Sequence, residues 1–119
     1  MKTKSTGFPR LYYATLYSLK GLVAAFKSEA AIRQELAAMC ILIPVACFLD
    51  VTVAERVLLI ATLFIVLVTE MLNSAIEALA DSVSDEVHVL IGKAKDIGSG
   101  AVFISLVLTG ITWTMILTG

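Results

Sequence analysis

Residues 97–119 contain no charged side chain. A helix needs about 20 consecutive apolar residues to cross the roughly 30 Å hydrocarbon core of a bilayer, and this segment is long enough. The whole chain of 119 residues is 59% hydrophobic, with a mean hydropathy of +0.94. A chain this short and this apolar cannot bury its hydrophobic side chains in a water-soluble core. The sequence therefore predicts an integral membrane protein.

Two shorter apolar segments, residues 36–49 and 57–69, come earlier in the chain and also carry no charge. The first covers only about 21 Å as a helix, so each must extend into its polar neighbours to cross the bilayer. We predict an all-α, single membrane domain over residues 1–119. The predicted membrane spans are residues 30–52, 55–82 and 93–118.

A further helix is predicted over residues 6–27, beginning near Pro9. Apolar side chains recur along one side of it, and Lys20 and Lys27 lie at the flank of the opposite face. A basic, aromatic-rich amphipathic helix suits the membrane surface. The alternative is an ordinary amphipathic helix packed on the rest of the protein; we favour the surface helix, and the two are compatible.

The basic residues predict the orientation in the membrane. Eight of the nine Lys and Arg residues, all except Arg56, lie before the first apolar segment or between the second and third. The positive-inside rule then predicts a cytoplasmic N-terminus and a periplasmic C-terminus. The formal net charge of −1 argues against nucleic acid as a partner.

An acidic row ends the second span. Glu70, Asn73, Glu77 and Asp81 fall within one narrow arc of a helix. Like charges at this spacing repel, and ionisable residues near the membrane are usually functional. We therefore expect groups outside this helix to compensate the row, although the sequence does not indicate a role for Asp81.

Three alternating spans bring the start of the first, the end of the second and the start of the third to one side of the membrane. Glu29, Arg33 and Glu35 precede the first apolar segment, while Lys95 and Asp96 open the third span. The topology thus predicts that these residues meet the acidic row at the cytoplasmic interface.

The chemistry of this cluster indicates a cation and a phosphate. Mg²⁺ prefers oxygen ligands and binds through one or two carboxylates plus phosphate oxygens. Lys95 suits a phosphate, and a carboxylate left free of metal is a candidate general base. No Walker A or protein-kinase signature is present. The residues therefore indicate metal–nucleotide chemistry on a lipid headgroup, while general motifs leave open an interfacial enzyme or an ion-coupled membrane protein.

Two other features of the apolar segments predict packing. Small side chains form a stripe along the third span, which we expect to be a helix-packing face. The stripe comprises Ala94, Gly98, Ala101, Ser105, Thr109 and Thr112. Cys40 and Cys47 are expected to be buried thiols rather than a disulfide or a metal site.

Two sequence blocks resemble the small bacterial diacylglycerol kinases. The first is residues 70–81, which read EMLNSAIEALAD; the second runs from Glu86 through residues 94–99, which read AKDIGS. Residues 20–35 also resemble the N-terminal part of the family, so the likeness covers nearly the whole chain. Gly100 stands where alanine is usual in the family.

The resemblance implies a homotrimeric enzyme of the bacterial inner membrane, with active sites shared between subunits. It implies transfer of the γ-phosphate of MgATP to diacylglycerol, giving phosphatidic acid. Glu70 is then the base, Asn73 and Lys95 act at the γ-phosphate, and Glu29 and Glu77 hold the metal. The nucleotide is expected at Arg10, Tyr17, Glu29, Glu77, Glu86, His88, Gly92, Lys95 and Asp96. The lipid is expected at Arg10, Ala14, Thr15, Leu16, Tyr17, Ser18, Leu19, Ala31, Ile32, Arg33, Gln34, Glu35, Glu70, Ser99 and Trp113.

Two alternatives stay open at this point. One is a kinase for an isoprenoid alcohol such as undecaprenol, which the same scaffold would suit. The other is a non-catalytic membrane protein whose acidic face binds cations, although such a protein has no need of Lys95.

Overall fold

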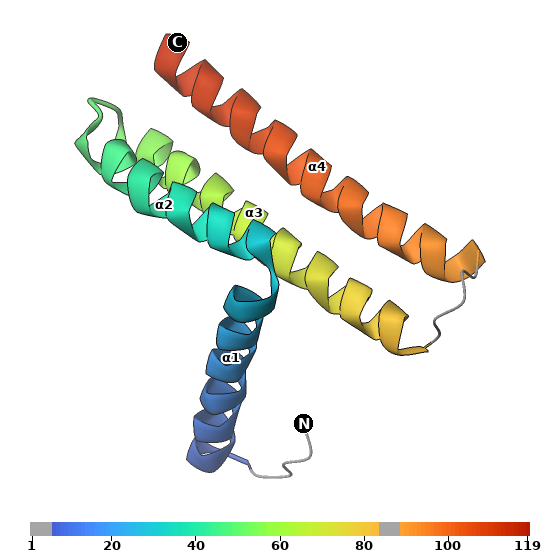
Figure 1. Ribbon diagram of the computed structural model, residues 1–119. Helices are drawn as coiled ribbons and strands as arrows, with labels where there is room; N and C mark the ends of the chain where they lie inside the picture. Colours follow the sequence, from blue (N-terminus) through green and yellow to red (C-terminus); the bar gives the residue numbers. More distant parts are fainter. Residues whose placement is uncertain (1–5, 84–88) are drawn as a thin grey trace.

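The computed structural model describes residues 6–83 and 89–119, and these form four α-helices (Figure 1). They are α1 (Phe8–Ser28), α2 (Ala30–Phe48), α3 (Val53–Val83) and α4 (Val89–Thr118). The described residues contain no strand. The prediction of an all-α fold is therefore confirmed.

Three of the helices, α2, α3 and α4, are long and apolar enough to cross a membrane. The 31 residues of α3 rise about 46 Å at 1.5 Å per residue, which exceeds a hydrocarbon core of roughly 30 Å. Counted from Val53, Glu70 comes after about 26 Å of helix. An apolar layer of that thickness that began at Val53 would therefore end within the acidic row, close to Asn73.

The central helix of the bundle is α3, which packs against α2 on one side and α4 on the other (Figure 1). Its buried side chains include Leu59, Leu63 and Val66, and the larger buried side chains of α2 are Ile32 and Met39. Most other large apolar side chains of the three helices are exposed. Such outward-facing apolar surface suits lipid, where only the backbone and polar groups need partners inside the protein.

The small-residue face of α4 is confirmed in part as a packing face, since Gly98 and Ser105 are the buried residues of α4 whereas Ala101 is exposed. Close to the C-terminal end of the helix, the indole Nε1 of Trp113 donates to the carbonyl of Leu59 and to Oγ1 of Thr62, both at 3.2 Å. Polar contacts therefore join α3 to α4 in a region otherwise made of apolar side chains.

The turn between α2 and α3 is closed by side chains. Guanidinium nitrogens of Arg56 donate to the carbonyls of Ala46 at 3.0 Å and Leu49 at 2.7 Å, which satisfies the end of α2. Thr52 and Glu55 bond each other's backbone N–H groups and form a capping box at the start of α3. As a result α2 ends at Phe48, whereas the first span was predicted to continue to residue 52.

The first helix stands apart from the bundle. Glu29 adopts an extended conformation (φ −116°, ψ 113°) between α1 and α2, and Figure 1 shows α1 leaving the bundle at this break. Arg33 secures the junction by donating to the carbonyls of Phe26 at 2.7 Å and Lys27 at 3.1 Å. No residue of α1 is buried.

The burial predicted for the two thiols is wrong. Cys40 and Cys47 are both exposed in this chain. The buried residues of α2 are instead Ile32, Met39 and Ala46, and apolar side chains that face lipid need no partner inside the protein.

Candidate active site

A cavity of about 250 Å³ lies where α2, α3 and α4 come together, at the end of the bundle near the α1–α2 break. Four of its lining residues are polar members of α3, and the others come from the start of α2 and from α4. The lining residues are Glu29, Ala31, Glu70, Asn73, Ser74, Glu77, Ser99 and Val102. The predicted convergence of the three spans at one polar site is therefore confirmed for Glu29 and for three members of the acidic row, Glu70, Asn73 and Glu77.

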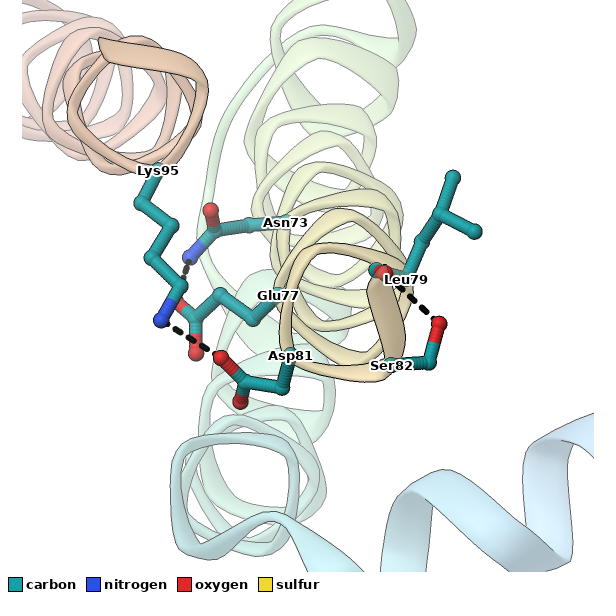
Figure 2. Close-up of polar contacts among 6 residues, drawn as sticks. All are labelled: Asn73, Glu77, Leu79, Asp81, Ser82 and Lys95. Carbon is teal, nitrogen blue, oxygen red and sulfur yellow. Dashed lines mark hydrogen bonds and ion pairs between the residues drawn. The ribbon is translucent and has the colours of Figure 1, made fainter. Parts of the chain in front are cut away.

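Within α3 the row is joined by a hydrogen bond. The carboxamide Nδ2 of Asn73 donates to Oε1 of Glu77 at 3.0 Å (Figure 2). Residues four apart on a helix face the same side, so the sequence spacing alone brings them into contact. The hydrogen bond uses the amide nitrogen of Asn73, so the carbonyl oxygen Oδ1 takes no part in the contact with Glu77.

That oxygen points at α4. A Cβ atom added to Gly98 would collide with Oδ1 of Asn73. Gly98 is buried, so the lack of a side chain there is what lets the carboxamide of Asn73 approach the backbone of α4. The glycine of the small-residue stripe therefore shapes the cavity as well as the helix packing.

Three oxygen atoms at this end of the bundle are buried and have no hydrogen-bond partner among the described residues. They are Oε2 of Glu35, Oε2 of Glu70 and Oδ1 of Asn73. A buried acceptor without a donor is costly, and in native proteins such groups are often satisfied by a bound ion, water or ligand. The cavity thus presents acceptor oxygens that a substrate or a cation can use.

Glu29 reaches the cavity from the junction of α1 and α2. Its Oε1 accepts a hydrogen bond of 3.1 Å from the hydroxyl of Ser74 on α3. No role was predicted for Ser74, although it belongs to the 70–81 block. A hydroxyl four residues after Glu70 was the available signal, because that spacing puts both on one face.

Lys95 approaches the same face from α4. Its ammonium group forms an ion pair of 2.6 Å with Oδ1 of Asp81. Figure 2 shows the side chains of Asn73, Glu77, Asp81 and Lys95 gathered between α3 and α4. The predicted meeting of Lys95 with the acidic row is confirmed, and the direct partner is Asp81.

Comparison with known proteins settles the family. The family model described as prokaryotic diacylglycerol kinase matches residues 16–117. The chain belongs to the prokaryotic diacylglycerol kinase family. It is 48% identical over 117 residues to a diacylglycerol kinase of Escherichia coli strain K12, covering 98% of this chain and 96% of that protein. It is 51% identical over 114 residues to the diacylglycerol kinase of Pseudomonas aeruginosa, covering 96% and 93% of the two chains. The corresponding Haemophilus influenzae protein is 47% identical over 114 residues, covering 96% and 97%.

These relatives are bacterial, and three helices of the chain are long and apolar enough to span a membrane. The chain therefore fits a bacterial membrane protein, as a member of the prokaryotic diacylglycerol kinase family should.

Not every site residue suggested by the resemblance to the diacylglycerol kinases lies at the cavity in this chain. Arg10 and Tyr17 are exposed on α1, which points away from the bundle, and Trp113 bonds to Leu59 and Thr62 instead. The residues of α1 predicted to touch lipid, from Ala14 to Leu19, likewise do not line the cavity. Ala31 and Ser99 do line it, as does Val102, which the sequence analysis did not single out.

Other predicted positions lie beside the cavity or outside the described part of the chain. Glu35 contributes one of the unpartnered oxygens, whereas Arg33 is committed to the α1–α2 junction. Gly92 and the exposed Asp96 lie in the first turns of α4. Glu86 and His88 fall outside the residues that the structure describes.

The donor atoms at the cavity are of the kind that Mg²⁺ prefers. Glu29 and Glu77 both line it, and carboxylate oxygens are hard ligands. Among the described residues of this one chain, no three His, Cys, Asp or Glu side chains come together as a metal cage. A site with two protein carboxylates suits Mg²⁺ that is shared with phosphate oxygens rather than a cation enclosed by protein alone.

Proposed function

We propose that this chain is a lipid kinase that transfers the γ-phosphate of MgATP to the hydroxyl of diacylglycerol, giving phosphatidic acid. The observation that carries the proposal is the cavity in which Glu29, Glu70, Asn73 and Glu77 meet at one end of three membrane-length helices. A reaction between a water-soluble nucleotide and a membrane lipid needs its polar groups at such an interface. The names of the relatives support the same reaction.

In this proposal Glu70 is the general base. As the lipid oxygen attacks the γ-phosphorus, its proton passes to the carboxylate of Glu70, and ADP leaves with the electrons of the broken P–O bond. The unpartnered Oε2 of Glu70 is free to accept that proton. The lipid hydroxyl would then sit in the cavity between Glu70 and Ser99.

Glu29 and Glu77 would hold Mg²⁺, with Ser74 orienting Glu29 and Asn73 orienting Glu77. When bound, the cation neutralises negative charge that the phosphates carry and develop during transfer. Asn73 and Lys95 act at the γ-phosphate. Phosphoryl transfer needs mainly positioning and charge neutralisation from the protein, and this set of residues offers both.

We further propose a homotrimer with shared active sites, in which the nucleotide and lipid contacts predicted for α1 are made at the site of a neighbouring chain. Arg10 and Tyr17 are exposed on α1 and do not line the cavity of their own chain, so in an assembly they are available to a neighbouring one. The apolar flank of α1, where Leu16, Leu19 and Val23 surround an open groove, suits lipid at the cytoplasmic surface. The basic residues favour a cytoplasmic N-terminus and a periplasmic C-terminus.

The test is ³²P transfer from ATP to a panel of lipid alcohols in mixed micelles, with Mg²⁺ present or chelated. We expect Mg²⁺-dependent labelling of diacylglycerol, well above that of undecaprenol. A strong preference for undecaprenol would mean that the chain is an undecaprenol kinase rather than a diacylglycerol kinase. No labelling of any alcohol would favour a non-catalytic, cation-binding membrane protein. Sedimentation of the detergent-solubilised protein tests the trimer separately.

A further inference from the structure

The proposed chemistry gives no role to Asp81, although its carboxylate forms an ion pair with Lys95. Oδ1 of Asp81 lies 2.6 Å from Nζ of Lys95, and the two side chains are 67% and 40% exposed. Exposed ion pairs contribute little to stability, because water screens them and two long side chains lose freedom. A structural bridge between α3 and α4 is therefore a poor explanation of the pair.

Lys95 has a second acidic neighbour. Glu77 lies one helical turn before Asp81 on the same face of α3, within electrostatic reach of the Lys95 ammonium group. Figure 2 shows the carboxylate of Glu77 beside that ammonium group, between Asn73 and Asp81. One oxygen of Glu77 already accepts the hydrogen bond from Asn73. An ammonium group on the other oxygen would compete with any cation that Glu77 binds.

We infer that Asp81 is a positioning residue that holds the Lys95 ammonium group away from Glu77. The Glu77 carboxylate then stays free to bind a divalent cation, while Lys95 stays paired with Asp81 beside the cavity. Because the pair is exposed, Lys95 can exchange Asp81 for a phosphate oxygen at little cost. This inference rests on the proposed function, in which Glu77 binds the metal and Lys95 the γ-phosphate.

The experiment measures Mn²⁺ binding to the nucleotide-free protein in detergent, from the electron paramagnetic resonance signal of free Mn²⁺. Asp81→Asn should raise the Mn²⁺ dissociation constant about two- to fivefold, the range that the small energy of an exposed ion pair allows. Asp81→Glu keeps the charge and should bind nearly as the wild type does. Asp50→Asn, an exposed acid in the α2–α3 turn, is the matched control and should change nothing.

A second pair of variants shows whether Asp81 acts through Lys95. In a Lys95→Met background there is no ammonium group to restrain, so adding Asp81→Asn should leave the dissociation constant unchanged. Equal weakening with and without Lys95 would mean that Asp81 acts on the cation itself, and would overturn the inference. So would equal Mn²⁺ affinity of wild type and Asp81→Asn.

Two further measurements keep the result unambiguous. Asp81→Ser removes the same carboxylate by a different side chain, so a folding defect in one variant does not decide the outcome. Labelling of diacylglycerol by the wild-type protein is measured alongside. Failure of that labelling overturns the proposed function, whereas normal labelling with unaltered Mn²⁺ binding by Asp81→Asn overturns only the role of Asp81.

Discussion

The hydroxyl of Ser74 donates a hydrogen bond of 3.1 Å to the carboxylate of Glu29, joining residues 45 positions apart in the chain. Glu29 lies in the extended break between α1 and α2, where no helix fixes its direction. The contact therefore draws the carboxylate of a junction residue onto α3 and closes one side of the cavity.

Loss of that contact should weaken the metal dependence of the reaction. In Ser74→Ala the Glu29 carboxylate keeps its charge but loses its orienting donor, so the Mg²⁺ concentration at half-maximal activity should rise about tenfold. The measurement is a Mg²⁺ titration of diacylglycerol phosphorylation. Ser82→Ala is the control, because the hydroxyl of Ser82 bonds to the carbonyl of Leu79 within its own helix. An unchanged midpoint in Ser74→Ala would count against Glu29 as a ligand held by Ser74.

Removal of the proposed base should stop turnover without preventing nucleotide binding. Glu70→Gln has nearly the same shape but cannot accept the lipid proton, so kcat should fall by about 10² to 10⁴. Steady-state phosphorylation and titration with a non-hydrolysable ATP analogue measure the two effects separately. Near-normal turnover would remove Glu70 from the role of base, and lost analogue binding would point to a part in holding the nucleotide.

A methyl group at Gly98 should displace Asn73. The added Cβ collides with Oδ1 of Asn73, so the carboxamide must leave its place beside Glu77. Misplacement of a catalytic group by about an ångström can reduce turnover about a hundredfold, and we expect a loss of that order in Gly98→Ala.

Gly100 provides the matched control for that substitution. It lies two residues further along α4, and a Cβ there meets open space. Gly100→Ala should keep wild-type turnover and stabilise the helix by up to about 1 kcal/mol. Similar activities in the two variants would show that the carboxamide adapts and that Gly98 serves only helix packing.

The α2–α3 turn should depend on Arg56 for stability and not for chemistry. Arg56→Met removes two charge-assisted hydrogen bonds, to the carbonyls of Ala46 and Leu49, far from the cavity. The free energy of unfolding should fall by about 1.5–3 kcal/mol, measured by denaturation in detergent, with unchanged turnover per folded molecule. Arg56→Lys should recover only part of the lost free energy of unfolding, because an ammonium group lacks the planar fork of the guanidinium. Unfolding like that of the wild type would show that water satisfies these carbonyls equally well.

Much of the site was predictable because helices repeat. The period of 3.6 residues puts Asn73 and Glu77 in contact whatever surrounds them, and three alternating spans bring Glu29 to the end of α3. The stripe on α4 predicted Gly98 and Ser105 as packing residues, because small side chains are what allow close approach. Termination of α2 at Phe48 was less predictable, since it depends on Arg56 reaching back to the preceding helix.

The sequence by itself determined the helical fold, the three membrane-length segments and the acidic face, because apolar length and helical period are local properties of the chain. Only the tertiary structure decided which partner each polar group takes. Ser74 meets Glu29, Asn73 approaches Gly98, and Lys95 pairs with Asp81 while Glu77 lies within reach. These pairings depend on the axial position and rotation of α2 and α4 relative to α3. Packing across the whole helix interface sets both, so they cannot be deduced from any one helix.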